Sequence, residues 1–331
     1  MNSKTQKALI TGGMGFIGSH LAETLLRNHY SVTSIDDLST GSFKNIEHLL
    51  AYPEFHFVIE TIMNENVMDR LISECDIIFH LAAAVGVKLI VEKPVEVIQK
   101  NVLGTEIVLR IANRYRKTTI LASTSEIYGK SNDIPFKEGS DRILGATTNH
   151  RWSYSDSKAI DEFLALAYHK ENQLPVVIVR LFNTIGIRQT GRYGMVVPTF
   201  VQQAVKGEPI TVYGDGDQSR CFCNVKDVVE GITRLAEHPD ALGQIFNLGN
   251  AEEISIRQLA QKVKEITRSG SDIVYIPYDL AYEEGFEDMR RRVPDITKAK
   301  SLIGFHPKVT LEESLMEIFQ FTKENLFPGW E

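Results

Sequence analysis

The sequence has little cysteine, no long apolar run and no excess of positive charge. Three cysteines in 331 residues do not make a disulfide framework, and a reducing compartment is the simpler home for them. Cys221 and Cys223 are too few to bind a metal ion without further ligands, so we expect core thiols and no metal site. The N-terminal residues lack the apolar run of a signal peptide, and no stretch of about 18 apolar residues indicates a membrane span. A net charge of −7 gives no general attraction to nucleic acid or to acidic membranes. We therefore expect a soluble, cytoplasmic protein without membrane or nucleic-acid partners.

The first half of the chain alternates short apolar runs with longer amphipathic ones. The runs are rich in β-branched residues on both faces, as strands covered by helices on both sides require. The expected strands are 7–11, 31–36, 55–59, 76–82, 118–124 and 175–181, and the expected helices are 16–28, 95–115 and 154–171. This repetition predicts an α/β protein with a doubly wound parallel sheet of the Rossmann type.

The pattern changes after residue 183, where Gly, Arg and Pro become frequent and the elements become shorter. Helices are expected at 255–267 and 310–326, each opened by a capping-box pattern, SIRQ or TLEE. We interpret 181–331 mainly as a smaller α/β substrate domain. It is partly interleaved with the first domain, 1–180, to which parts of 221–250 return.

A Gly-rich turn between the first strand and the first helix predicts a dinucleotide site. In ITGGMGFIGSH, Gly12, Gly15 and Gly18 permit a tight turn and close approach of the backbone to a pyrophosphate. Asp36 ends the next strand, where a carboxylate binds the ribose hydroxyls. No Arg or Lys follows until Lys44, so a 2′-phosphate would meet two carboxylates, which favours NAD over NADP. The residues predicted to bind NAD are Gly12, Gly15, Phe16, Ile17, Gly18, Asp36, Asp37, Leu81, Ala82, Ala83, Asn101, Tyr154 and Lys158.

A second group of polar residues predicts redox chemistry at the same edge of the sheet. Thr124, Ser125 and Glu126 follow the fifth strand, and Tyr154 and Lys158 lie four apart at the start of a helix. A neighbouring ammonium and a positive nicotinamide ring both favour a tyrosinate, which can then take a proton from an alcohol. Alternatively, Tyr154 and Lys158 are two surface residues on one helical face. The three polar residues after the fifth strand would then only cap the next element.

The motifs together resemble the extended short-chain dehydrogenase/reductase family of nucleotide-sugar epimerases, dehydratases and decarboxylases. The similarity runs over nearly the whole chain, through TGGMGFIG, HLAA, STSEIYG, YSDSK, RLFNTIGIR and RRRVPDITKAK. It implies tightly held NAD and catalysis by Thr124, Tyr154 and Lys158, with Lys158 also at the nicotinamide ribose. It further implies that Asn183 contacts the phosphates of a nucleotide sugar.

The resemblance leaves three reactions open after the sugar is oxidised at C4. A Glu at position 126 resembles UDP-glucuronate decarboxylases and 4,6-dehydratases, including GDP-mannose enzymes, where it would take the C5 proton. Ser125 stands where several dehydratases have Asp, which counts against dehydration. Arg292, two residues before Pro294, matches the decarboxylases, where such an arginine faces a carboxylate or diphosphate. We expect decarboxylation of UDP-glucuronate, with 4,6-dehydration and 4-epimerisation as alternatives. A non-catalytic NAD sensor is disfavoured because such proteins lose the Tyr or the Lys.

The expected contacts to the nucleotide sugar come mostly from the second half of the chain. They are Asn183, Arg188, Arg192, Val197, Tyr213, Arg220 and Arg292. For the charged members an alternative remains open. Arg290, Arg291 and Arg292 would then be a solvated basic face, and Arg188 and Arg192 surface charges of a loop.

The helices at 95–115 and 154–171 carry more apolar residues than one sheet face needs. Val97, Val102, Ile107, Leu164 and Leu166 are examples. Pairing these helices with those of a second copy would form a four-helix interface, so we expect a homodimer. Burial of the same residues within one subunit is the alternative.

Overall fold

The computed structural model describes residues 5–191, 195–278 and 289–326. Its centre is a seven-stranded parallel sheet in the order β11-β6-β5-β4-β1-β2-β3. The strands are β1 (Lys7–Thr11), β2 (Ser31–Asp36), β3 (Phe55–Ile59), β4 (Ile77–His80), β5 (Thr118–Thr124), β6 (Val176–Leu181) and β11 (Gln244–Leu248). The chain order reverses between β1 and β4, and ligands of such sheets bind in the crevice at the carboxyl ends of the strands there. The predicted Rossmann-type fold is confirmed.

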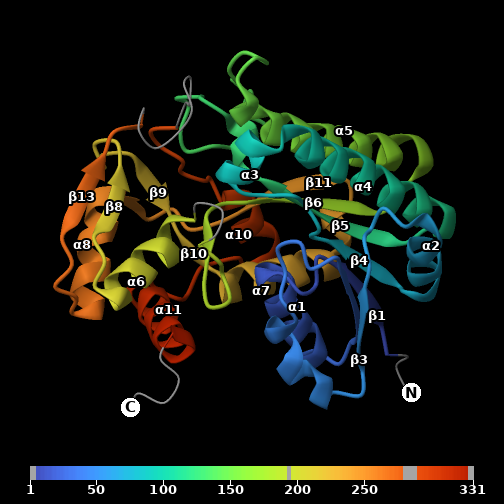
Figure 1. Ribbon diagram of the computed structural model, residues 1–331. Coiled ribbons are helices and arrows are strands. Elements are labelled where there is room, and N and C mark those ends of the chain that lie inside the picture. The colour runs from blue at the N-terminus through green and yellow to red at the C-terminus, as the bar shows by residue number, and fades with distance from the viewer. Residues whose placement is uncertain (1–4, 192–194, 279–288, 327–331) are drawn as a thin grey trace.

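Helices cover both faces of the sheet (Figure 1). On one face α1 (Phe16–Arg27) and α7 (Val225–Glu237) bury residues such as Leu21, Leu25 and Ile232 against the strands. On the other face lie α2 (Glu65–Glu74), α4 (Pro94–Tyr115) and α5 (Ser153–Asn172). Because both faces are covered, the strands are apolar on both sides, which is the pattern that the sequence shows.

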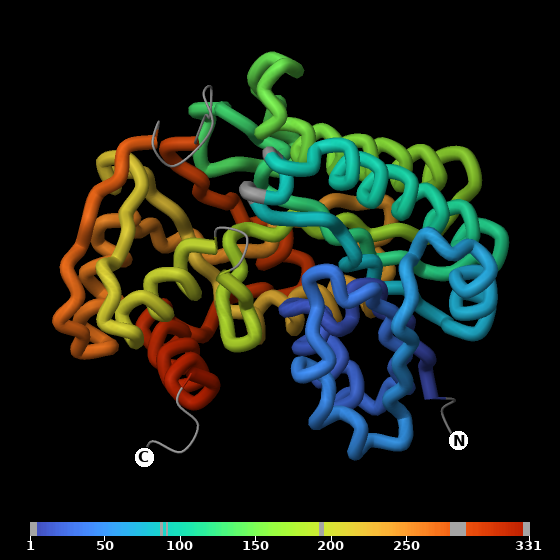
Figure 2. Tube along the Cα trace, viewed as in Figure 1, coloured from blue at the N-terminus to red at the C-terminus, as the bar shows by residue number. Residues whose placement is uncertain are grey.

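The later part of the chain forms a second layer of structure beside the sheet (Figure 2). Its core is built from α6 (Val196–Lys206), β8 (Ile210–Tyr213), α8 (Ile256–Thr267) and α11 (Leu311–Leu326). Short strands accompany them: β7 (Thr184–Ile185), β9 (Ser219–Cys221), β10 (Cys223–Asn224), β12 (Glu253–Ser255) and β13 (Ile273–Ile276). Between these pieces the chain returns to the main sheet as α7, β11 and α10 (Thr297–Ile303). The division into a cofactor domain and a substrate domain stays a prediction.

Local signals in the sequence locate the helix ends well. Ser255 and Gln258 form the capping box predicted for α8, and Thr310 and Glu313 exchange the equivalent hydrogen bonds at α11. The helices α2, α6 and α7, whose ranges the sequence pattern did not single out, are additional. No helix in the described part of the chain is long and apolar enough to cross a membrane.

Two of the five apolar residues named for a dimer interface do not lie at the surface. Val97 and Ile107 are buried, because their side of α4 packs inside the subunit. Different residues form the exposed apolar face of the two helices: Val95, Ile98 and Leu103 on α4, and Ile160 and Phe163 on α5.

Candidate active site

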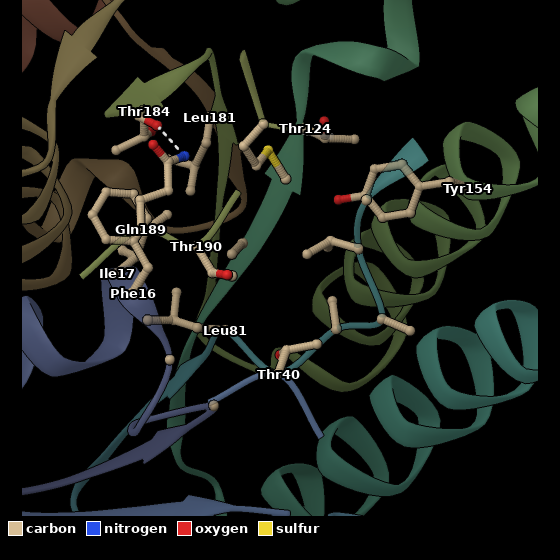
Figure 3. A pocket seen from close by; sticks show the side chains of 18 of the residues that line it. Phe16, Ile17, Thr40, Leu81, Thr124, Tyr154, Leu181, Thr184, Gln189 and Thr190 are labelled. Atoms are coloured by element: carbon tan, nitrogen blue, oxygen red, sulfur yellow. Dashed lines mark hydrogen bonds between the residues drawn. The ribbon is translucent and has the colours of Figure 1, made fainter. Parts of the chain in front are cut away.

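A cavity of about 1090 Å³ opens at the carboxyl ends of the strands, between the main sheet and the second layer (Figure 3). It is lined by nearly all of the residues that the sequence predicted for the site. These include the three glycines, Asp36, Asp37, Leu81, Ala82, Ala83, Thr124, Ser125, Glu126, Tyr154, Lys158, Asn183, Arg188, Val197, Tyr213, Arg220 and Arg292. Arg192 lies outside the described residues. The structure therefore brings the predicted cofactor, catalytic and substrate groups to one place.

The Gly-rich turn has the shape of a pyrophosphate cradle. Gly12 has a φ of +71°, and a Cβ there would lie 2.9 Å from the backbone nitrogen of Ala82. A Cβ on Gly18 would lie 2.2 Å from the carbonyl oxygen of Gly12, so both positions require glycine. Gly15 precedes α1 without a side-chain cap, which leaves the N–H groups of the first turn for an anion. The turn fits a dinucleotide.

Asp36 lies at the end of β2, as predicted. Its carboxylate accepts hydrogen bonds from the backbone N–H groups of Met14, at 3.0 Å, and Leu38, at 2.9 Å. Burial raises its pKa. A cation does lie near this pair of carboxylates, contrary to the prediction, because Lys100 of α4 is 3.4 Å from the Asp37 carboxylate. The lysine was missed because it lies 63 residues away in the sequence. Asp36 itself still disfavours a 2′-phosphate.

Asn101 is a correction to the predicted cofactor set. It is buried and does not line the cavity. Its side-chain oxygen accepts from the backbone N–H of Ala84 at 2.8 Å, and its nitrogen donates to the Ser157 hydroxyl at 3.2 Å. Asn101 thus joins the segment after β4 to helix α5, behind the cofactor wall.

Tyr154 points its hydroxyl into the cavity on the side of Thr124 (Figure 3). Thr124 is held in place because its side-chain oxygen accepts a hydrogen bond from the backbone N–H of Glu126 at 3.2 Å. Burial, and then the Glu126 carboxylate, raise the pKa of Tyr154 above its usual value. That direction is opposite to the expectation that Lys158 lowers it.

A further, smaller contribution to this raised pKa comes from a carboxylate next to Lys158. Its ammonium is buried and donates to the Asp161 carboxylate at 2.7 Å. Because this carboxylate compensates the ammonium, little positive charge remains to stabilise a phenolate. Asp161 was not among the predicted site residues, although its place one helical turn after Lys158 was an available signal.

Glu126 lies between two buried arginines. One carboxylate oxygen is 2.7 Å from the guanidinium of Arg292, and the other is 2.6 Å from that of Arg151. Although burial would raise it, Arg151 and then Arg292 lower the pKa of Glu126 to about 2. Arg151 was not among the predicted site residues. Its position three residues before Tyr154 was the available signal.

The three consecutive arginines separate into two kinds. Arg290 pairs with Asp215 and Arg291 with Glu253 on the surface. For these two residues the alternative prediction of a solvated basic face is correct. Arg292 alone turns into the cavity and is 8% exposed. The position of an arginine within this run therefore decides whether it faces the cavity or the solvent, because neighbouring side chains of an extended segment point in different directions.

The remaining predicted substrate residues surround the same cavity. Arg188 contacts the helix α1, where it pairs with Glu23 at 2.5 Å, so its charge is largely compensated. Asn183 donates to the carbonyl of Cys221 at 3.0 Å, and Arg220 donates to the carbonyl of Met289 at 2.8 Å. These contacts fix the substrate side of the cavity to the rest of the chain.

A dinucleotide cradle that opens onto Thr124, Tyr154 and Lys158 is the arrangement of a short-chain dehydrogenase. Comparison with known proteins identifies the family within the short-chain dehydrogenases to which the chain belongs. A family model described as GDP-mannose 4,6 dehydratase matches residues 9–318. The chain therefore belongs to this family of nucleotide-sugar enzymes, within the extended short-chain dehydrogenases.

Individual relatives are decarboxylases and epimerases. The chain is 43% identical to UDP-N-acetyl-alpha-D-glucosaminuronate decarboxylase of Bacillus cytotoxicus, over 96% of this chain and 98% of that one. It is 36% identical to UDP-glucuronic acid decarboxylase 1 of Danio rerio, over 97% of this chain and 73% of the relative. Among solved structures it is similar to UDP-glucuronic acid 4-epimerase of Bacillus cereus in complex with UDP-glucuronic acid and NAD. The TM-score is 0.88 and the identity 28%, over 97% and 100% of the two chains.

Proposed function

We propose that this protein is an NAD-dependent decarboxylase of a UDP-linked hexuronate, acting through a transient 4-keto sugar. The observation that carries the proposal is the buried guanidinium of Arg292, in the cavity that Thr124 and Tyr154 line. A substrate carboxylate placed there would meet two arginines, Arg292 and Arg151, which lie on either side of Glu126. The named decarboxylases among its relatives support the same reaction.

The Gly-rich turn, Asp36 and Lys158 would hold NAD, which supplies reversible uptake of a hydride from C4 of the sugar. Tyr154 takes the proton of the C4 hydroxyl, while Thr124 hydrogen-bonds the same oxygen. The C6 carboxylate is then β to a ketone. The C5–C6 bond breaks, CO₂ leaves and the electron pair moves onto the C4 oxygen as an enolate. Protonation of C5 and return of the hydride to C4 give a UDP-pentose.

The state of Glu126 separates this reaction from dehydration. Dehydration needs a base to remove the C5 proton, and a carboxylate whose pKa is about 2 is a weak base. Decarboxylation needs no such base, because the departing CO₂ leaves its electron pair behind. The geometry thus favours a role for Glu126 in orienting Arg151 and Arg292.

Incubation with four nucleotide sugars, read by mass spectrometry, tests the proposal. The substrates are UDP-glucuronate, UDP-N-acetylglucosaminuronate, UDP-glucose and GDP-mannose. We expect either or both uronates to lose the mass of CO₂ and the neutral sugars to be unchanged. Loss of the mass of water from a neutral sugar would show a dehydratase instead. Unchanged mass with inverted stereochemistry would show an epimerase.

Replacing Arg292 tests the observation that carries the proposal. Arg292→Met should raise KM for the uronate by about 10- to 100-fold, because a buried charge-assisted hydrogen bond contributes roughly 1.5–3 kcal/mol. Arg291→Met is the matched control, since Arg291 is its neighbour but pairs with Glu253 on the surface. Equal effects of the two substitutions would contradict the proposal.

We also propose that two copies associate through α4 and α5 and that the protein is cytoplasmic. Phe163 on α5 is 67% exposed, and Val95 on α4 is 66% exposed; covering such residues with a second copy would remove apolar surface from water. Phe163→Glu should convert a dimer to a monomer in size-exclusion chromatography with light scattering. Leu50→Glu, at an exposed apolar site outside these helices, should leave the dimer intact. The cytoplasmic location is supported by the three free, buried cysteines.

A further inference from the structure

Lys158 is paired with a buried carboxylate behind the wall of the cavity. The ammonium of Lys158 donates to Oδ2 of Asp161, whose side chain is 0% exposed. The other carboxylate oxygen, Oδ1, is buried and accepts no hydrogen bond from the described residues. A separate hydrogen-bonded group lies on α4, β4 and β1: the Thr105 hydroxyl lies 3.1 Å from Nε2 of His80, and Nδ1 of His80 lies 2.7 Å from the hydroxyl of Thr11.

The direction of each hydrogen bond follows from its neighbours. The hydroxyl oxygen of Thr11 accepts from the backbone N–H of Ala82 at 3.2 Å, so its own proton is available for Nδ1 of His80. Burial, and then Lys158, lower the pKa of His80 to about 3, so the imidazole is neutral. Its proton is then on Nε2 and is donated to Thr105. The hydrogen bond to the Asp161 carboxylate comes from the ammonium of Lys158.

We propose that Asp161 is a positioning residue, which orients the ammonium of Lys158 and sets the net charge beside Tyr154. It does not line the cavity, so it acts through Lys158 and not by touching a ligand. The hydrogen bond of 2.7 Å from Lys158 holds the carboxylate and the ammonium together in the buried space behind the cavity. The inference rests on the proposed function only in that Tyr154 and Lys158 are the catalytic pair.

Two charges oppose the loss of the Tyr154 proton and one assists it. Glu126, from the turn after β5, and Asp161, from α5, raise the pKa of Tyr154, whereas Arg151 lowers it. Around Asp161 itself the charged neighbours are Lys158 and Glu162. Removing the charge of Asp161 while keeping its shape should therefore ease ionisation of Tyr154.

A titration of the Tyr154 phenolate tests this without any turnover. The ultraviolet phenolate band is followed against pH in NAD-loaded enzyme, and the signal of Tyr154 is the difference from the same protein with Tyr154→Phe. Asp161→Asn should move the midpoint to lower pH. Asp156→Asn is the matched control, because Asp156 is on the same helix but half exposed and paired with Arg142; it should leave the midpoint unchanged.

An unchanged midpoint in Asp161→Asn, or a shift to higher pH, would overturn the proposal. Asp161→Ser provides a second reading, because it also removes the negative charge that faces the ammonium of Lys158. It should shift the midpoint in the same direction. Should Asp161→Asn not fold, an unmoved midpoint in Asp161→Ser refutes the inference. Because no sugar is involved, a wrong substrate assignment would not affect any of these outcomes.

Discussion

The ion pair between Arg180 and Glu162 should be the most costly single contact to break near the site. Arg180 on β6 donates to both carboxylate oxygens of Glu162 on α5, at 2.9 and 2.7 Å. Both residues are 5% exposed. Arg180 also donates to the Tyr128 hydroxyl at 2.9 Å and to the Glu138 carbonyl at 3.0 Å. The pair therefore anchors to the sheet the helix that carries Tyr154 and Lys158.

Glu162→Gln keeps the shape but leaves the buried guanidinium without a counter-charge. Breaking one side of a buried pair costs about 3–5 kcal/mol. For 331 residues the entropy of unfolding is about 0.7 kcal/mol/K near the midpoint, so we expect the Tm to fall by about 4–7 °C. Arg180→Met should cost a similar amount, because it strands the carboxylate instead.

A double-mutant cycle by thermal unfolding of the NAD-loaded enzyme checks the reasoning. The protein with both substitutions contains neither buried charge, so its destabilisation should be smaller than the sum of the two single effects by about 2 kcal/mol. Additive losses would show that the two side chains do not interact energetically. In that case the anchoring of α5 must be attributed to apolar packing alone.

Three further predictions concern the site and the thiols. Tyr154→Phe should reduce turnover by about 10²- to 10⁴-fold and leave NAD bound, as measured by nucleotide released on denaturation; full activity would refute the assignment. Burial raises the pKa of Cys75 and Cys221 to about 12, so a thiol reagent at neutral pH should label unfolded but not native protein. The pKa of Glu126 is lowered from 4.5 to about 2, so its ionic contribution to stability is present above pH 4.5 and lost as the pH falls through 2. The Tm difference between the native protein and Glu126→Gln should shrink over that range, and a constant difference would contradict it.

The fold and the cofactor cradle could be predicted because their signals are local. A buried strand, a turn that requires glycine and a capped helix are each encoded within about ten residues. The carboxyl ends of parallel strands then meet at one edge, so Thr124 and Asp36 were placed correctly without knowledge of any contact.

The partners of the predicted residues could not be found in the same way. Lys100, which contacts Asp37, belongs to α4, a helix that follows β4 in the chain. Arg151 enters the cavity from a single turn of helix, His150–Trp152. These contacts depend on how distant elements pack. The exposed face of α4 was misjudged for the same reason, since apolar periodicity does not tell which neighbour covers a residue.

The partners matter because they set the charge along the cavity, and the charge along the cavity determines how a ligand must lie. The Asp36 end is negative, the Lys158–Asp161 pair in the middle is neutral, and at the other end Arg151, Arg220 and Arg292 gather near Glu126. A ribose with two hydroxyls suits the first end, and an anion suits the last. A sugar that carries both a diphosphate and a carboxylate would place its neutral C4 between them, beside Tyr154. In a protein of net charge −7, this cluster of arginines is the part of the cavity that suits the anionic groups of a sugar.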